Sequence, residues 1–152
     1  MRRNTSLAGA MLLLASLRLG AQPSGVVGDW KDPTGSVIRI SECGAQLCLH
    51  IVFLSPEAPA ATDVHNPEPG ERHRALCGLE IGSGFALHDA DHAAGGTLYD
   101  PKSGKTYRGS MTAEGAKLEL RGYVGIPLFG ESQTWTRVAA PVKACAGGVP
   151  GQ

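Results

Sequence analysis

Apolar and polar side chains alternate with a period of two through most of this chain, a pattern typical of β-strands with one buried face. In residues 46–54 it places Leu47, Leu49, Ile51 and Phe53 on one face of an expected strand. The same pattern recurs at residues 37–42, 97–99, 106–112, 117–124 and 131–137, with glycine or proline between the segments. After residue 21, no segment of the sequence shows the apolar periodicity of a helix. The chain is therefore predicted to be all-β, either a sandwich or an up-and-down barrel of short antiparallel strands.

The segments between the expected strands have the composition of turns and loops. Residues 43–46 are the expected turn of one hairpin, and residues 100–105 form a second hairpin loop in which Gly104 takes a positive φ. Residues 56–69 are rich in proline and alanine, which predicts a long irregular excursion within one domain. Residues 138–152 are small and rich in glycine, which predicts a C-terminal tail.

The N-terminus has the pattern of a secretory signal peptide. Two arginines precede a short apolar run, and the run ends in small residues at Ala21. An arginine interrupts the run, which is shorter than the roughly 20 residues that span a bilayer, so an uncleaved anchor helix is the less favoured alternative. The first cysteine is Cys43, too far from the apolar run for a lipid anchor. We expect a signal peptide at 1–21, a folded domain at 22–138 and a glycine-rich tail at 139–152, in a periplasmic or secreted protein.

The charge of the processed chain limits its partners. Loss of residues 1–21 would remove three of the 14 basic residues and none of the 14 acidic ones, which leaves 11 against 14 and a formal charge of −3. This balance argues against a nucleic acid or an anionic lipid surface as a partner. No stable membrane insertion is expected after cleavage, and the remaining length matches one domain.

The even number of cysteines, 4, indicates disulfides in an oxidising compartment. Cys43 and Cys48 lie across the expected hairpin, so a structural bridge is favoured over a redox-active pair, whose spacing is shorter. Cys77 and Cys145 are left, and a bridge between them would close a long loop and hold the tail. The alternative is that Cys77 is a free cysteine buried on a strand.

Several motifs together resemble DUF2147, a family of small exported bacterial proteins of unknown function. They begin with Gly-Asp-Trp at 28–30, Cys-Gly-Ala-Gln-Leu-Cys at 43–48 and Asp-Val-His-Asn-Pro-Glu-Pro at 63–69, and continue at 72–78, 95–101, 104–107, 121–130 and 133–137. The resemblance covers nearly the whole domain. It implies a small lipocalin-like β-barrel of about eight antiparallel strands, and closure of the barrel would also remove exposed strand edges.

The same resemblance implies structural roles for two residues at one end of the barrel. Trp30 on the first strand would fill the closed end, and Arg137 of the last strand would lie over it in a cation–π contact of about 0.5–2 kcal/mol. Trp135 is likewise expected to be structural. The alternative is that Trp30 is an ordinary core aromatic and Arg137 a solvated strand end.

The most polar segment, residues 63–74, admits two interpretations. Asp63, Asn66, Arg72 and Arg74 are candidates for a rim that reads the polar head of a ligand, because arginine pairs well with carboxylates. In the alternative, which we favour, Asp63 and Asn66 are turn residues and the arginines pair with nearby acids.

The sequence offers little that points to metal binding or catalysis. Residues 88–92 contain two histidines and two aspartates, but an expected turn does not aim them at one ion as a helix would, so a solvated loop is favoured. No nucleophile elbow, phosphate loop or Cys-x-x-Cys motif occurs. We expect no metal, no cofactor and no catalytic residue; a hydrolase or isomerase that uses Asp63, His65 and Arg72 or Arg74 is the least favoured hypothesis.

The favoured function is a binding module that holds an apolar or amphipathic small molecule inside the barrel. Alternation alone selects the inward-facing ligand contacts Ile51, Phe53, Tyr107, Met111, Leu118 and Leu120. The alternative is a solid barrel that recognises a protein partner through residues 63–74 and the loop at Leu128 and Phe129. A cavity inside the barrel distinguishes the two hypotheses.

Overall fold

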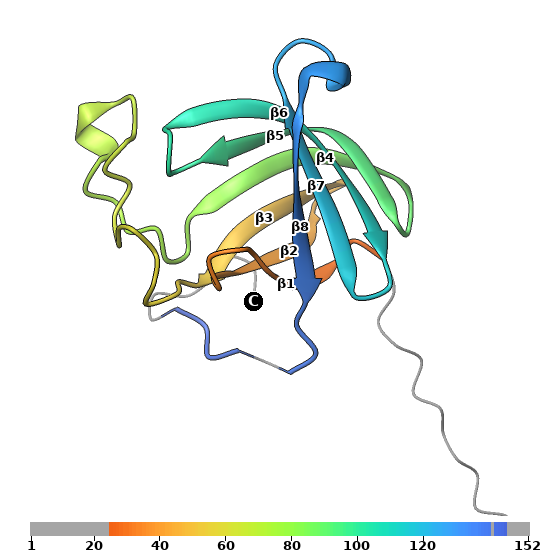
Figure 1. The fold of residues 1–152 in the computed structure, drawn as a ribbon, viewed down its shortest axis with the longest axis horizontal. Coiled ribbons are helices and arrows are strands. Elements are labelled where there is room, and N and C mark those ends of the chain that lie inside the picture. Colours follow the sequence, from red (N-terminus) through yellow and green to blue (C-terminus); the bar gives the residue numbers. More distant parts are fainter. Residues whose placement is uncertain (1–24, 141, 146–152) are drawn as a thin grey trace, which may run out of the picture.

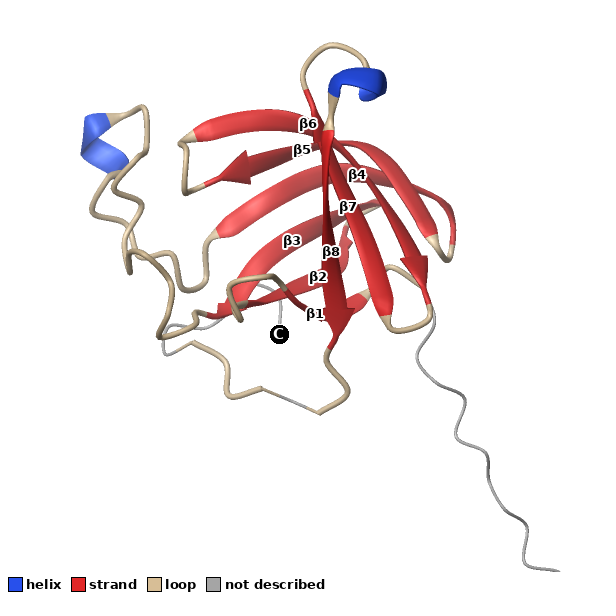
Figure 2. Ribbon diagram, in the orientation of Figure 1, coloured by secondary structure: helices blue, strands red, loops and turns tan. Residues whose placement is uncertain are grey.

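A computed structural model describes residues 25–140 and 142–145 and shows a closed barrel of eight antiparallel strands (Figures 1 and 2). Each strand pairs with the next along the chain, and β1 pairs with β8 to close the barrel. The strands are β1 (Gly28–Lys31), β2 (Val37–Cys43), β3 (Gln46–Phe53), β4 (Glu80–Asp89), β5 (His92–Asp100), β6 (Lys105–Glu114), β7 (Lys117–Tyr123) and β8 (Glu131–Arg137). The predicted up-and-down barrel is thereby confirmed, and the sandwich is excluded.

Two single-turn 3₁₀ helices, η1 (Pro69–Glu71) and η2 (Pro127–Phe129), lie in the loops after β3 and β7. Among the described residues no helix is long and apolar enough to cross a membrane. The expected signal peptide lies outside the described residues, as do residue 141 and residues 146–152 of the expected tail.

Strands β4 and β5 occupy a stretch in which the sequence shows little alternation. The sequence indicated a strand only from Thr97 and a loop at residues 88–92, whereas the two strands are separated by a two-residue turn. Glycines weaken the strand pattern in both. Gly96 is needed there because a Cβ at this position would lie 2.3 Å from the ring of Phe85, which is fully buried inside the barrel. Packing of one aromatic ring thus overrides local strand propensity.

Trp30 and Arg137 seal the end of the barrel at which the described chain enters. Trp30 is fully buried and donates its indole N–H to the carbonyl oxygen of Val26 at 2.8 Å. The guanidinium of Arg137 lies 4.0 Å from the centroid of the Trp30 ring. It also donates hydrogen bonds to the carbonyl oxygens of Gly25 and Val27. Arg137 therefore ties the last strand to the segment that leads into the first, and it is not a solvated strand end.

The side chains inside the barrel divide it into a filled half and a hollow half. The filled half lies against the closed end and contains side chains that are at most 2% exposed: Trp30, Leu47, Leu49, Phe85, Met111 and Leu118. The opposite end is surrounded by the longer loops, at residues 32–36, 54–79, 101–104 and 124–130. In the second hairpin loop Gly104 has the expected positive φ, 68°.

All four cysteines are paired in two disulfides, one across a hairpin and one between a loop and the C-terminal segment. Cys43 and Cys48 bridge the hairpin between β2 and β3 with a Cα–Cα distance of 5.8 Å. Cys77 and Cys145 connect the loop after β3 to the C-terminal segment, with a Cα–Cα distance of 5.6 Å. The backbone N–H of Cys145 donates to the carbonyl oxygen of Val52 at 2.8 Å, so this segment lies against β3. Both expected pairings are present.

Replacement of Trp30 by alanine is expected to destabilise the domain by about 3–5 kcal/mol, because truncation of a buried aromatic leaves a cavity. Urea unfolding of the oxidised protein measures the change. Leu87→Ala is the control, since Leu87 is 43% exposed and its loss should change the stability by less than about 0.5 kcal/mol. A loss below about 1 kcal/mol for Trp30→Ala would show that Trp30 does not fill the barrel end.

The two disulfides are expected to differ in their contribution to stability. The entropy lost by the unfolded chain grows with the length of the closed loop, and the two bridges join cysteines 68 and 5 positions apart. Replacing both Cys77 and Cys145 by alanine should therefore cost about 4 kcal/mol, and replacing both Cys43 and Cys48 about 2 kcal/mol. Urea unfolding of the two double variants checks the order. The opposite order would contradict the loop-closure argument.

Candidate functional site

The hollow half of the barrel contains a cavity of about 470 Å³. This volume falls within the range of about 300–1,000 Å³ that is typical of small-molecule sites. Buried aliphatic side chains from β2, β3, β4, β5, β7 and the loop after β3 form its walls: Ile38, Ile51, Leu76, Ile81, Leu98 and Leu120. The protein-recognition hypothesis required a solid barrel, and this barrel contains a cavity.

The two halves of the barrel differ in how completely their side chains fill it. Trp30 and Phe85 fill the closed half, whereas the corresponding positions near the open end are aliphatic, and Gly122 on β7 adds no side chain at all. Aromatic residues line the cavity as well: Tyr99, Tyr107, Tyr123, Phe129 and Trp135. Trp135 is 4% exposed and donates its indole N–H to Oε1 of Gln133 at 3.2 Å, which fixes it as part of the cavity wall.

The mouth of the cavity combines exposed apolar side chains with fixed charges. Val124 and Phe129 are 70% and 76% exposed, and both line the cavity from the loop between β7 and β8. The charged side chains that line it are Asp32, Asp100, Lys102 and Glu131. Three of these four are acidic, so the charged side chains that line the cavity have a formal net charge of −2.

Both aspartates at the mouth are held in place by their own loops. Oδ1 of Asp32 accepts hydrogen bonds from the backbone N–H groups of Thr34 at 2.9 Å and Ser36 at 3.0 Å. Asp100 accepts from the backbone N–H of Lys102 at 3.0 Å and from the hydroxyl of Ser103 at 2.7 Å. These carboxylates are therefore fixed local charges rather than mobile side chains.

Three of the six inward residues selected by alternation line the cavity: Ile51, Tyr107 and Leu120. Met111 and Leu118 point into the barrel but belong to its filled half, so they form no part of the cavity wall. Phe53 is half-buried and lies outside the cavity, because the pairing of β2 with β3 shifts register between Val37 and Ile38. A bulge of this kind reverses which residues face inward, and alternation along one strand cannot reveal it.

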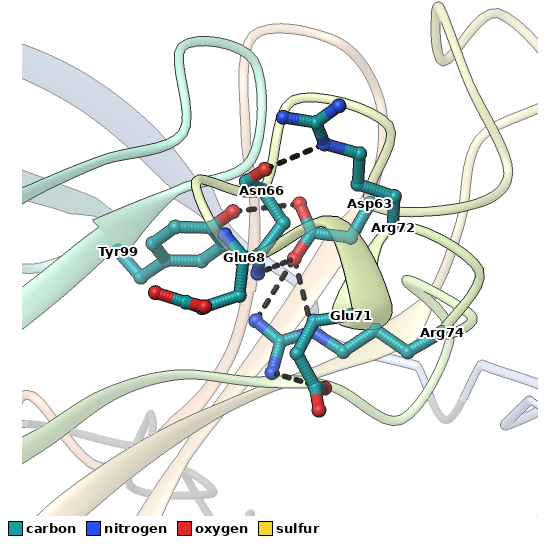
Figure 3. Close-up of polar contacts among 7 residues, drawn as sticks. All are labelled: Asp63, Asn66, Glu68, Glu71, Arg72, Arg74 and Tyr99. Carbon is teal, nitrogen blue, oxygen red and sulfur yellow. Dashed lines mark hydrogen bonds and ion pairs between the residues drawn. The ribbon is translucent and has the colours of Figure 1, made fainter.

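Asp63 is the centre of a buried polar cluster beside the cavity (Figure 3). Its side chain is fully buried, and Oδ1 accepts a hydrogen bond from the hydroxyl of Tyr99 at 2.7 Å. Oδ2 accepts from the amide of Asn66 at 2.8 Å and from Nε of Arg74 at 2.9 Å. The carboxylate is thus occupied by groups of the protein, and it fastens the loop after β3 to β5.

Arg74 and Arg72 complete this cluster without reaching the cavity. The guanidinium of Arg74 lies 5.5 Å from the centroid of the Tyr99 ring and forms a second ion pair with Glu71 at 3.5 Å. Arg72 donates to the backbone carbonyl oxygen of Asn66 at 2.8 Å. None of the four residues named as a possible ligand rim, Asp63, Asn66, Arg72 and Arg74, lines the cavity. Their contacts are those of the structural alternative.

The electrostatics of the cluster favour an ionised Asp63. Burial alone would raise the pKa of Asp63, but hydrogen bonds from Asn66, Tyr99 and Arg74 and the charge of Arg74 outweigh it, so the pKa lies below its usual range. Burial and the hydrogen bond to Asp63 raise the pKa of the Tyr99 phenol. Tyr99 therefore stays a hydrogen-bond donor, and this rigid cluster presents its ring to the cavity.

The histidines are distributed over separate parts of the structure. His65 lines the cavity, but Asp63 and Arg72, its partners in the enzyme hypothesis, are engaged in the cluster described above. His92 pairs through Nδ1 with Asp89 at 2.8 Å across the turn between β4 and β5, and this contact lowers the pKa of Asp89. Within residues 25–140 and 142–145, no group of three or more histidine, cysteine or acidic side chains is arranged to hold a metal ion.

Several cavity residues were not named from the sequence. Ile38 and Leu98 lie in segments whose alternation had been recognised, so pairing of both strands around a barrel would have identified them. Leu76 comes from the irregular loop after β3 and Ile81 from the unrecognised strand β4, whereas His65 was named only in the enzyme hypothesis. Local patterns carry no signal for Leu76 and Ile81 as cavity residues, because only the folded barrel brings the loop and β4 to the cavity.

Stability is expected to fall with acid as Asp63 is protonated. The pKa of Asp63 is lower in the folded state than in the unfolded state, where it is about 3.9. The contribution of ionised Asp63 to the free energy of unfolding is therefore complete above the unfolded-state pKa and is lost as the pH falls through the folded-state pKa. Asp63→Asn should cost about 1–3 kcal/mol at neutral pH and should reduce the acid dependence of urea unfolding. Glu71→Gln is the control, because its exposed ion pair with Arg74 contributes less than about 1 kcal/mol. Equal effects of the two substitutions would contradict this role of Asp63.

Comparison with known proteins identifies a structure with a similar fold and the family of this chain. A search of curated proteins finds no match to the chain. The structure is similar to protein HP1028 from Helicobacter pylori, described as a member of the lipocalin family, with a TM-score of 0.69 and 21% sequence identity over 77% of this chain and 85% of that one. At this identity the similarity shows a shared barrel fold. The profile of the family described as uncharacterised and conserved in bacteria, DUF2147, matches residues 28–137, from the start of β1 to the end of β8. The chain belongs to the DUF2147 family.

Proposed function

We propose that this protein is an exported binding module whose barrel cavity holds an apolar or amphipathic small molecule. The observation that carries the proposal is the cavity of about 470 Å³, with buried aliphatic walls and its mouth among exposed apolar side chains. An apolar ligand would remove these walls from water, which stabilises a complex by roughly 25 cal/mol per Å² of buried apolar surface. Export is supported by the two disulfides, which persist in oxidising compartments.

The residues at the mouth suggest which head group such a ligand carries. Asp32, Asp100 and Glu131 outnumber the single basic residue, Lys102, among the charged side chains that line the cavity. A carboxylate or phosphate head would therefore be repelled, whereas an uncharged or cationic head would not. Hydroxyl and amide groups of Tyr107, Ser132 and Gln133 also line the cavity and supply hydrogen-bonding partners for an uncharged head group.

Native mass spectrometry of protein exported and purified without detergent tests occupancy directly. Extra mass that disappears on denaturation is the expected result, and its identification gives the ligand class. The denatured mass of the same sample reports whether cleavage follows Ala21 and whether all cysteines are oxidised. Bare protein that also fails to bind an apolar fluorescent probe would overturn the proposal.

The cavity itself is tested with N-phenyl-1-naphthylamine, an uncharged apolar probe whose fluorescence rises on transfer from water. Leu120→Trp should weaken binding about tenfold or more, because the larger ring occupies the cavity and overpacking costs about 1–3 kcal/mol. Glu119→Trp is the matched control, since the adjacent residue on β7 is exposed and does not line the cavity. Equal binding by the two variants would locate the probe elsewhere.

A further inference from the structure

The barrel is closed by a very short contact between its first and last strands. β1 contains four residues and β8 contains seven, and they pair only at Trp30 with Arg137 and at Lys31 with Thr136. β7, on the other side, pairs with β8 from Glu131 to Thr136. Part of β8 near the open end therefore has a neighbouring strand on one side and none on the other among the described residues.

The hydrogen-bond directions identify which backbone groups face the vacant side. The N–H of Arg137 donates to Ala116, on the β7 side, and the N–H of Val138 donates to Asp29 of β1. Direction alternates along an antiparallel strand, so odd-numbered residues of β8 bond toward β7 and even-numbered residues bond toward β1. The N–H and C=O groups of Ser132 and Thr134 consequently point to the side from which β1 is missing.

The sequence explains why β1 stops where it does. Continued in register, β1 would place Pro33 opposite Thr134, and proline has no N–H to donate to a strand. Instead, Asp32 accepts hydrogen bonds from the backbone of Thr34 and Ser36, which turns the chain back into β2. The edge of β8 at Ser132 and Thr134 is left uncovered by this turn, and both residues are exposed.

The space beside this edge is continuous with the cavity. Asp32, Thr34 and Ser36 line the cavity from the turn after β1, and Ser132 and Gln133 line it from β8. The turn at residues 32–36 and the strand β8 therefore line one cavity, and we call the space between them the slot. In Figure 1, β8 runs along the front of the barrel from the loop that contains η2 down to its contact with β1, with β7 beside it.

We propose that this slot binds an extended segment of a second polypeptide by strand addition to β8. The added strand would take the hydrogen bonds of Ser132 and Thr134 that β1 does not reach. Its alternate side chains would enter the cavity against Ile38, Leu120 and Trp135, so an apolar residue is required at every second position. The proposal goes beyond small-molecule binding, because its affinity comes from backbone groups that such a ligand does not use.

Shape and charge select a foreign peptide over other occupants. The slot lies between β8 and the turn at residues 32–36, so it suits a single extended segment rather than the edge strand of a second folded barrel. Residues 146–152 of this chain contain three glycines and a proline, a composition that disfavours strands. Asp32 and Glu131 line the cavity from the two sides of the slot, so a peptide with basic rather than acidic flanks is favoured.

Amide hydrogen exchange followed by NMR tests the vacant edge in the free protein. The N–H groups of Ser132 and Thr134 should exchange at least about tenfold faster than those of Gln133 and Trp135, which bond toward β7. The probe is the capped peptide Lys-Val-Thr-Val-Thr-Val-Lys, which should slow exchange at Ser132 and Thr134 by about tenfold or more. Slow exchange at both residues in the free protein, or no slowing with saturating peptide, would overturn the proposal.

A pair of variants separates strand addition from simple occupation of the cavity. Thr134→Pro removes one outward N–H and should weaken peptide binding about tenfold, whereas Thr134→Ala removes only the side chain and should leave it unchanged. Binding of N-phenyl-1-naphthylamine to the same samples verifies that each variant folds and keeps its cavity. Probe binding without peptide binding would contradict strand addition and leave the small-molecule proposal standing. Peptide binding equal in the two variants would also contradict it.

Discussion

The contact between Trp30 and Arg137 joins the first and last strands at the closed end of the barrel. Only two residue pairs join β1 to β8, so the backbone ladder alone closes the barrel weakly. The guanidinium over the buried indole and its hydrogen bonds to Gly25 and Val27 add side-chain closure at the same point. A cation held against a desolvated aromatic face contributes up to about 2 kcal/mol. This closure allows the opposite half of the barrel to remain hollow.

In this structure the polar cluster has a structural role, and the apolar residues form the candidate binding surface. Asp63, Asn66 and Arg74 were the polar candidates for ligand contacts, but their hydrogen bonds hold the loop after β3 against β5. A buried carboxylate without these partners would cost several kcal/mol of solvation, so the cluster must be satisfied within the protein. The candidate binding surface is made instead by aliphatic side chains such as Ile51 and Leu120, whose individual chemistry is unremarkable.

Much of the fold could be predicted from the sequence, because strand alternation, turn glycines and cysteine spacing are local signals. Both disulfides and the contact of Arg137 with Trp30 were anticipated, the latter from family resemblance. The strand β4 was not, since its glycines look unfavourable until Phe85 is placed against Gly96. Phe53 was assigned to the wrong environment, because a shift in register between β2 and β3 is a property of two strands together.

An all-β domain with paired cysteines follows from patterns among neighbouring residues, so it can be predicted from the sequence. Which inward side chains line the cavity and which fill the core depends on the folded barrel. The division depends on distances between strands that are far apart in sequence, as Trp30, Phe85 and Leu118 show. The same holds for the edge of β8 that β1 does not cover. Pro33, which follows β1, lies far from β8 in the sequence, and the two meet only in the closed barrel. Closure of the barrel brings these positions together, and no local sequence pattern predicts that they are close in space.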